Sequence, residues 1–133
     1  MILRRLLIAG LLAASMPISH AENWPVWRGP RGDGSSLEKN PPIHWSATSN
    51  VVWKTAVPGE GHSSPIIWND RIFLTTAFQD TQERALLSFD RASGKLLWQQ
   101  TVVKAPLEAK NPENSYASSS VATTRSVRSR DES

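Results

Sequence analysis

The residues that decide the fold lie at positions 87–98 and read LSFDRASGKLLW. A short apolar run ends at Asp90, a turn-forming segment follows, and a second apolar run leads to Trp98. A connection this short joins antiparallel neighbours, because a parallel crossover needs a dozen or more residues. The stretch therefore predicts two adjacent strands of an antiparallel sheet.

The same alternation of apolar runs and turn signals continues on both sides of this stretch. Five strands are expected, at residues 51–57, 64–68, 71–78, 85–90 and 95–102. The last four are separated only by short loops, such as the two-residue break at Asn69 and Asp70. We therefore predict an all-β chain whose core is one four-stranded antiparallel meander.

The third of these runs is apolar on both faces of the expected sheet. Ile72, Leu74 and Phe78 point one way, and Phe73 and Ala77 point the other way. A sheet that is apolar on both faces must be covered on both faces. Other parts of the chain, or another protein surface, are therefore expected to pack on each side.

An internal sequence repeat, called the echo below, suggests what packs on the two faces of the sheet. Residues 51–57, VVWKTAV, align with residues 96–102, LLWQQTV, so that Trp53 corresponds to Trp98. A weaker echo relates residues 64–67, SPII, to residues 119–122, SSVA. A spacing of about 45 to 55 residues with four strands in each unit is typical of propeller blades. The segment 51–57 is then a strand that belongs to a different blade.

These residues resemble a known family. Residues 63–67, 70–74 and 87–98 look like one complete repeat of the pyrroloquinoline-quinone-like (PQQ-like) β-propeller family, and residues 23–30 and 53–65 resemble its secreted bacterial members. The residues that carry the repeat motif are Asp90, Ser93, Gly94, Lys95 and Trp98, with Trp53, Ser64 and Pro65 outside the main stretch. The resemblance implies that the Asp90 carboxylate accepts backbone N–H groups, that Gly94 closes the turn at positive φ, and that Trp98 packs between blades.

The chain divides into six segments. Residues 1–21 read as a signal peptide, with Arg4 and Arg5 before an apolar run and a small-residue cleavage site at Ala21. A coil rich in Trp and Pro follows at 22–50, then the N-terminal closing strand and loop at 51–62 and the blade at 63–104. Residues 105–120 read as a linker and the start of the next blade. Residues 121–133 read as a disordered Ser- and Arg-rich tail, as a shifted reading frame would produce, so we expect an N-terminal fragment of a longer propeller.

Composition excludes several classes of protein. The chain has no cysteine, which removes disulfides and thiolate metal sites. Its 15 basic residues nearly balance 12 acidic ones, and two of the basic residues lie in the signal, so a nucleic-acid partner is not expected. The apolar run at residues 6–14 is too short to span a bilayer comfortably, so we expect cleavage and no stable membrane insertion. An uncleaved N-terminal anchor is the alternative.

No catalytic, cofactor-binding or metal-binding residue is assigned. His62 precedes Ser63 and Ser64, but the sequence places no orienting acid beside them. Glu60, Asp80 and Glu83 lie in loops without the spacing of a calcium site. His44, between Ile43 and Trp45, reads as a packing or surface residue.

Three functions are open. The PQQ-like fold is shared by quinone- and calcium-dependent dehydrogenases and by scaffold propellers resembling the outer-membrane assembly protein BamB, and no residue here matches the dehydrogenase ligands. We expect an exported, non-catalytic interaction or scaffold segment without a cofactor, located in the periplasm or outside the cell. Its partner would be an unidentified protein, and the remaining blades are missing. The alternatives are the N-terminal part of a quinone-dependent dehydrogenase and a small carbohydrate-binding β-domain that uses Trp24, Trp27 and Trp45.

Overall fold

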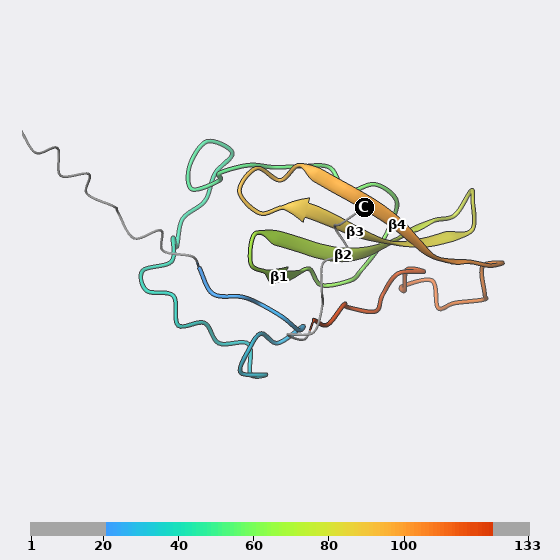
Figure 1. Ribbon diagram of the computed structural model, residues 1–133, viewed down its shortest axis with the longest axis horizontal. Coiled ribbons are helices and arrows are strands. Elements are labelled where there is room, and N and C mark those ends of the chain that lie inside the picture. The colour runs from blue at the N-terminus through green and yellow to red at the C-terminus, as the bar shows by residue number, and fades with distance from the viewer. Residues whose placement is uncertain (1–20, 124–133) are drawn as a thin grey trace, which may run out of the picture.

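The computed structural model describes residues 21–123, so the expected signal peptide, apart from Ala21, and the tail beyond residue 123 lie outside the described residues. The described chain contains four strands: β1 (Ile66–Trp68), β2 (Arg71–Phe78), β3 (Glu83–Asp90) and β4 (Leu96–Lys104). They form one antiparallel sheet in the order β1-β2-β3-β4 (Figure 1). The predicted all-β, four-stranded antiparallel blade is confirmed, and the observed strand ends differ from the expected ones by at most two residues.

The turns between strands lie where the sequence places Asn, Gln and Gly. Trp68 pairs with Arg71, so the β1–β2 connection has two residues, and Asn69 takes a φ of 53° there. Gln82 has a φ of 56° before β3, and Gly94 has a φ of 71° before β4. Positive φ suits Asn and Gly, because the first forms local hydrogen bonds and the second has no Cβ.

The edge of β2 beyond β1 is completed by a side chain. The Ser63 hydroxyl donates to the Thr75 carbonyl at 2.9 Å and accepts the Thr75 N–H at 3.0 Å. One step further along, Glu60 and Ala77 exchange two backbone hydrogen bonds of 2.9 Å each. The chain from Glu60 to Trp68 therefore follows the whole of β2, and Ser63 replaces the backbone partner where the chain bulges outward.

One face of the sheet holds much of the core. Its side chains include Thr76, Ala85, Leu87 and Phe89, all buried. The segment before β1 crosses this face: Trp53 contacts Gly94 at one end of the sheet, and the Thr76 hydroxyl donates to the Pro58 carbonyl at 2.6 Å near the other end. Residues 51–57 thus cover the sheet and belong to no strand in this chain.

That result differs from the expected strand at 51–57, and the reason is the absence of a neighbouring strand for it within the described residues. A single strand without a partner leaves its backbone groups unpaired and gains no ladder. Its place in a different blade stays a prediction.

The opposite face is covered by the C-terminal part of the described chain. Ile66, Ala77 and Ser88 are buried on this side, and so is Ala117 in the segment that packs over it. The Thr75 hydroxyl donates to the Ser119 carbonyl at 2.9 Å, and the His62 N–H donates to the Ala117 carbonyl at 3.1 Å. Both faces are therefore covered, as the pattern in β2 requires. Residues 105–120 form no strand here, so their role as the start of another blade stays a prediction.

The Trp- and Pro-rich coil is attached to the sheet at β1. Trp24 and Ile67 exchange backbone hydrogen bonds of 2.8 and 2.9 Å, and the rest of the coil loops around the sheet (Figure 1). The N–H of Thr123 donates to the Pro25 carbonyl at 3.0 Å, which brings the two ends of the described chain together. The described residues contain no helix that is long and apolar enough to cross a membrane.

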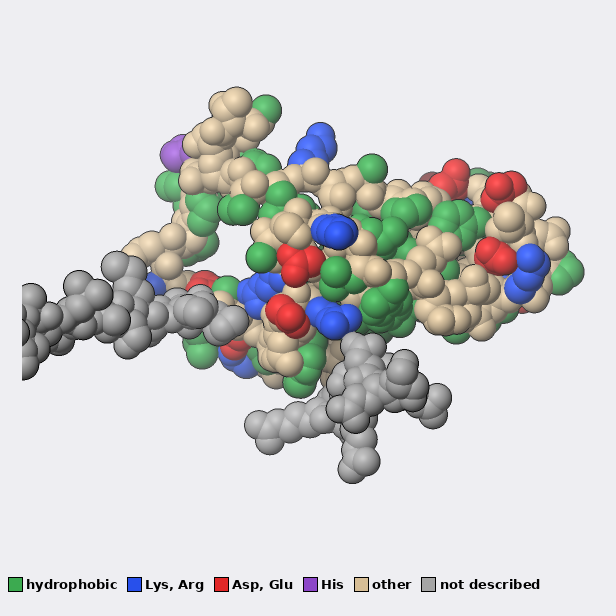
Figure 2. Space-filling model, turned by 45° about the horizontal axis from the view of Figure 1, so that its top comes forward, with side chains coloured by type: hydrophobic (Ala, Val, Ile, Leu, Met, Phe, Trp, Pro, Cys, Tyr) green, Lys and Arg blue, Asp and Glu red, His purple; other side chains and the backbone are tan. Residues whose placement is uncertain are grey.

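The outer strand β4 is the least buried part of the sheet, and every one of its residues except Thr101 is exposed. Apolar side chains are prominent among those residues: Leu96, Leu97, Trp98, Val102 and Val103. In Figure 2 hydrophobic side chains reach the surface over the sheet, between charged groups.

Candidate blade-packing site

The site is built on the turn between β3 and β4. The Asp90 carboxylate accepts the Ser93 N–H at 2.7 Å and the Ser93 hydroxyl at 2.6 Å on the same oxygen. The Gly94 N–H donates to the Asp90 carbonyl at 2.8 Å, and the Asp90 N–H donates to the Lys95 carbonyl at 2.8 Å. Four residues of the repeat motif thus form one closed turn, in which Ser93, Gly94 and Lys95 each form a hydrogen bond with Asp90.

The hydrogen bonds from Ser93 also set the charge state of the turn. They favour the ionised carboxylate, so they lower the pKa of Asp90, first through the Ser93 hydroxyl and then through its N–H. Burial acts in the opposite direction and is the smaller effect. Asp90 is therefore an anion at neutral pH that serves the turn.

Trp53 packs on this turn from outside the blade. A Cβ built on Gly94 would lie 2.6 Å from Trp53 Cδ2, which is closer than real side chains approach. The indole N–H donates to the Arg91 carbonyl at 3.0 Å. Gly94 is thus required twice, because its φ is positive and because the indole occupies the space of a side chain.

Trp98, the counterpart of Trp53 in the echo, has a different environment. Its ring lies 5.9 Å from that of Phe73 at an interplanar angle of 49°. Phe73 and Trp98 are the two cross-strand neighbours of Ser88, which is fully buried between them. Trp98 itself remains 37% exposed. Its expected position between two blades stays a prediction.

Ser64 and Pro65 lie away from the turn, just before β1. The Ser64 N–H donates to the Ser120 hydroxyl at 3.1 Å, so the segments related by the weaker echo run side by side. Of the eight motif residues, the structure brings together Trp53 and the four residues of the turn. Trp98, Ser64 and Pro65 belong to other parts of the blade.

His62 and Ser63 form hydrogen bonds that hold the backbone in place. Both hydrogen-bonding roles of the Ser63 hydroxyl go to the backbone of Thr75. The backbone of His62 donates to Ser115 Oγ at 2.9 Å as well as to Ala117. These contacts hold the loop on β2 and on residues 115–117. They supply a reason for His62 and Ser63 that does not involve a reaction.

The three loop carboxylates do not gather. Glu60 accepts a hydrogen bond of 2.6 Å from Gln79, and Glu83 forms an ion pair of 3.0 Å with Lys104. Within residues 21–123, no group of three His, Cys, Asp or Glu side chains is placed to hold a metal ion. The expectation that no metal residue can be assigned stays a prediction for the whole protein.

The tryptophans proposed as a sugar platform are not equivalent. Trp24 lies against Gly29, and its indole N–H donates to the Trp27 carbonyl at 3.2 Å. Trp27 and Trp45 are largely exposed, and the Arg28 guanidinium lies 4.8 Å from the centroid of the Trp27 ring. One of the three rings therefore serves to pack the coil.

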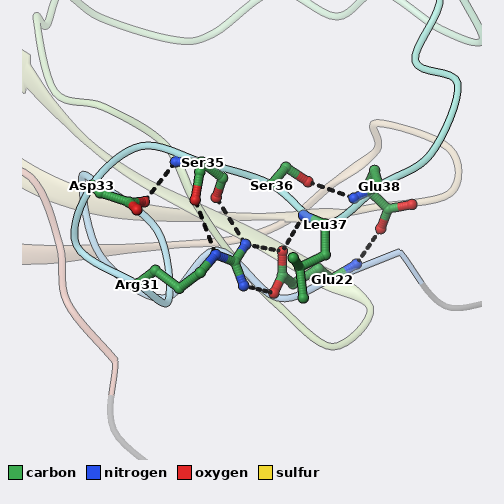
Figure 3. A network of polar contacts seen from close by, with 7 residues as sticks. All are labelled: Glu22, Arg31, Asp33, Ser35, Ser36, Leu37 and Glu38. Atoms are coloured by element: carbon green, nitrogen blue, oxygen red, sulfur yellow. Dashed lines mark hydrogen bonds and ion pairs between the residues drawn. The ribbon is translucent and has the colours of Figure 1, made fainter.

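A network in the coil was not anticipated from the sequence (Figure 3). The Arg31 guanidinium donates two hydrogen bonds of 2.7 Å to the Glu22 carboxylate, and it also donates to the Ser35 carbonyl at 2.8 Å. The N–H of Glu22 donates to Glu38 Oε1 at 2.8 Å. The only signal for it is the concentration of Gly, Asp and Ser at 32–36, which predicts turns but not the partner of Arg31.

The charges in this network stabilise one another. The hydrogen bonds from Arg31 are the main reason that the pKa of Glu22 is lowered, and the same bonds raise the pKa of Arg31. The N–H of Ser35 is the first cause of the lowered pKa of Asp33. All three groups are thus held in their charged forms.

Comparison with known proteins places this arrangement in a family. Residues 38–128 match the PQQ_2 family, whose description is "Outer membrane protein assembly factor BamB". The match covers more than half of the chain and includes Trp53, the turn at Asp90 and all four strands. No curated protein and no solved structure gives a significant match. The chain therefore belongs to the BamB-like family of PQQ-like β-propeller repeat proteins.

Proposed function

We propose that this chain is an exported, non-catalytic propeller segment that serves interaction or scaffolding in the periplasm or outside the cell. Three features support export: the basic residues Arg4 and Arg5, the apolar run after them, and the small residue at Ala21. The description of the matched family names an outer-membrane assembly factor, which agrees with that location. The partner would be a protein surface.

The observation that carries the proposal is the apolar character of β4. Trp98 is 37% exposed and Val102 is 65% exposed, although both lie on a strand whose neighbour β3 is well buried. An outer strand with this many exposed apolar side chains fits against another protein surface, because leaving them in water is unfavourable. The outer edge of β4, which pairs with no strand among residues 21–123, can also accept a further strand.

The turn at Asp90 explains why the packing has a defined geometry. Trp53, which follows an apolar pair, already packs on Gly94 and donates to the Arg91 carbonyl. The turn at Asp90 is thus a binding place for a Trp side chain at the end of a blade. Trp98 follows a similar apolar pair, and the described chain has no second turn of this kind to receive it. We infer that Trp98 contacts a corresponding turn on the partner surface, which in a longer propeller is the next blade.

The test is site-specific photocrosslinking in exporting cells. A photoreactive amino acid replaces Trp98 in the full chain, and the matched control replaces Asp80, which lies exposed in the β2–β3 loop. One discrete adduct at position 98, absent at position 80, is the expected result. Equal labelling at both positions, or none at either, would show that β4 faces solvent and would overturn the proposal.

A separate test concerns the further blades that a longer propeller would contain. The DNA downstream of the Ser119 codon is translated in the other two frames. Further copies of the pattern Asp, Ser or Thr, Gly, Lys and Trp, at a spacing of about 40 to 55 residues, are expected. If no copies occur, Trp98 has no next blade to contact, and the partner surface must belong to another molecule.

A further inference from the structure

The backbone nitrogen of Glu22 donates its hydrogen bond to a carboxylate far away in the sequence. It donates to Glu38 Oε1 at 2.8 Å, across 16 residues of chain. The side chain of Glu22 forms the ion pair with Arg31 at 2.7 Å, and its carboxylate also lies 3.5 Å from the N–H of Leu37. Glu22 is therefore held through both its nitrogen and its carboxylate by the loop that ends at Glu38 (Figure 3).

Glu22 is also the residue that follows the expected cleavage site at Ala21. Hydrolysis of the Ala21–Glu22 peptide bond by a signal-peptidase-class enzyme consumes one water molecule. The hydroxyl adds to the carbonyl carbon of Ala21, and the proton goes to the nitrogen of Glu22. At neutral pH that amine binds a further proton, since an α-amino group has a pKa of about 7.7 to 8.0.

We propose that Glu38 is the receptor for the α-ammonium group that cleavage after Ala21 creates at Glu22, so that processing turns the hydrogen bond that closes the loop at 22–38 into an ion pair. This inference rests on the proposed export and cleavage. An amide N–H and a carboxylate form one hydrogen bond, whereas an ammonium group offers three donors and a full positive charge. The contact already present then becomes an ion pair without movement of the loop.

The charges around the nitrogen favour this pairing. The carboxylate of Glu38 accepts from it, and the carboxylates of Glu22 and Asp33 belong to the same group of polar contacts. The cation in this network is Arg31, and its charge is paired with the Glu22 carboxylate through two bonds of 2.7 Å. Arg91 donates to the carbonyl of Ala21 at 3.1 Å and to the carbonyl of Asn69 at 3.1 Å. Cleavage removes Ala21, and the hydrogen bond from Arg91 to Asn69 then remains.

The pairing makes the position of cleavage matter. If Ala21 were kept, the ammonium group would lie one residue, about 3.5 Å, away from the nitrogen that contacts Glu38. If Glu22 were removed, Arg31 would lose its carboxylate partner as well. Only a chain that begins at Glu22 gives Glu38 an ammonium partner while it keeps the Glu22 carboxylate on Arg31.

The experiment measures how fast the α-amine of the processed chain reacts with a limiting acylating reagent near pH 7, by mass spectrometry of the N-terminal peptide. Pairing holds the amine protonated and slows the reaction. Glu38→Gln should therefore react about threefold faster than the wild type, the size expected for one exposed charge pair. The matched control is Glu113→Gln, an exposed glutamate whose side chain lies outside this network.

A second variant controls for the possibility that Glu38→Gln changes the structure of the loop. A chain that keeps Ala21 at its N-terminus has the native Glu38, and it should also react about threefold faster than the wild type. Equal rates in all of these proteins would overturn the pairing. If the processed chain from cells begins elsewhere than Glu22, the proposed cleavage fails, and the same comparison on a chain cut at Glu22 in vitro decides the pairing by itself.

Discussion

The indole ring of Trp53 occupies the space that a side chain at Gly94 would fill, with Cδ2 only 2.6 Å from an ideal Cβ at that position. Trp53 lies before the blade in the sequence, and Gly94 lies inside the turn that closes β3 and β4. The contact ties a segment that forms no strand in this chain to the most recognisable residues of the repeat. It holds one end of the segment that covers one sheet face, and the bond from Thr76 to Pro58 lies near the other end.

Gly94→Ala should destabilise the protein by about 2 to 5 kcal/mol. Roughly 1 to 2 kcal/mol comes from the positive φ, and overpacking against Trp53 adds about 1 to 3 kcal/mol. The measurement is urea unfolding followed by tryptophan fluorescence, in the assembly state in which the wild type is isolated. Gly32→Ala is the matched control, because Gly32 has a φ of 73° but no atom within 4 Å of an added Cβ. Equal losses in the two variants would show that Trp53 does not occupy the Gly94 site.

Ser63→Ala should lower the free energy of unfolding by about 1 to 2 kcal/mol. The change removes the hydroxyl that bonds both the N–H and the carbonyl of Thr75, and it leaves part of the β2 edge without a partner. The neighbouring Ser64→Ala should stay within about 0.5 kcal/mol of the wild type. Amide hydrogen exchange at Thr75 gives a local readout: it should accelerate only in the Ser63 variant. Unchanged exchange at Thr75 in both variants would contradict the role of Ser63.

Ser88→Ala should be neutral or stabilise the protein by up to about 1 kcal/mol. The Ser88 hydroxyl is buried and has no hydrogen-bond partner among the described residues. Thr76→Val is the contrasting variant, since it also removes one buried hydroxyl, but one that donates to Pro58 at 2.6 Å. That variant should lose about 1 to 2 kcal/mol. A comparable loss in both variants would mean that Ser88 has a partner.

The stability of the protein should fall at low pH partly because of Asp90. Its pKa is lowered in the folded state, so its contribution is present above the ordinary Asp value of about 3.9 and is lost as the pH falls through the folded value. Asp90→Asn should therefore show a smaller loss of stability between neutral pH and the acid range than the wild type. Asp80→Asn is the control and should follow the wild type. Urea unfolding at a series of pH values separates them, and parallel curves for all three proteins would contradict the assignment.

The sequence alone determined the strands and their order. The apolar runs and two-residue to five-residue breaks in residues 64–104 allow only antiparallel neighbours, and the four observed strands follow that meander. The role of Asp90 in the turn was also readable, because a carboxylate three residues before Ser93 can reach its N–H. These features depend on local geometry, which short sequence patterns specify.

Only the tertiary structure decided which segments cover the sheet and which side chains meet across long separations. Residues 51–57 read as a strand, yet they lie across a sheet face, because a β-strand is stabilised by a neighbour, and the part of the chain that the structure describes places none beside them. Trp53 packs against Gly94, and the nitrogen of Glu22 donates to Glu38. The spacing of apolar and polar residues in the sequence predicts neither contact. Such contacts depend on how loops return to the sheet, and that is set by the packing of the whole chain.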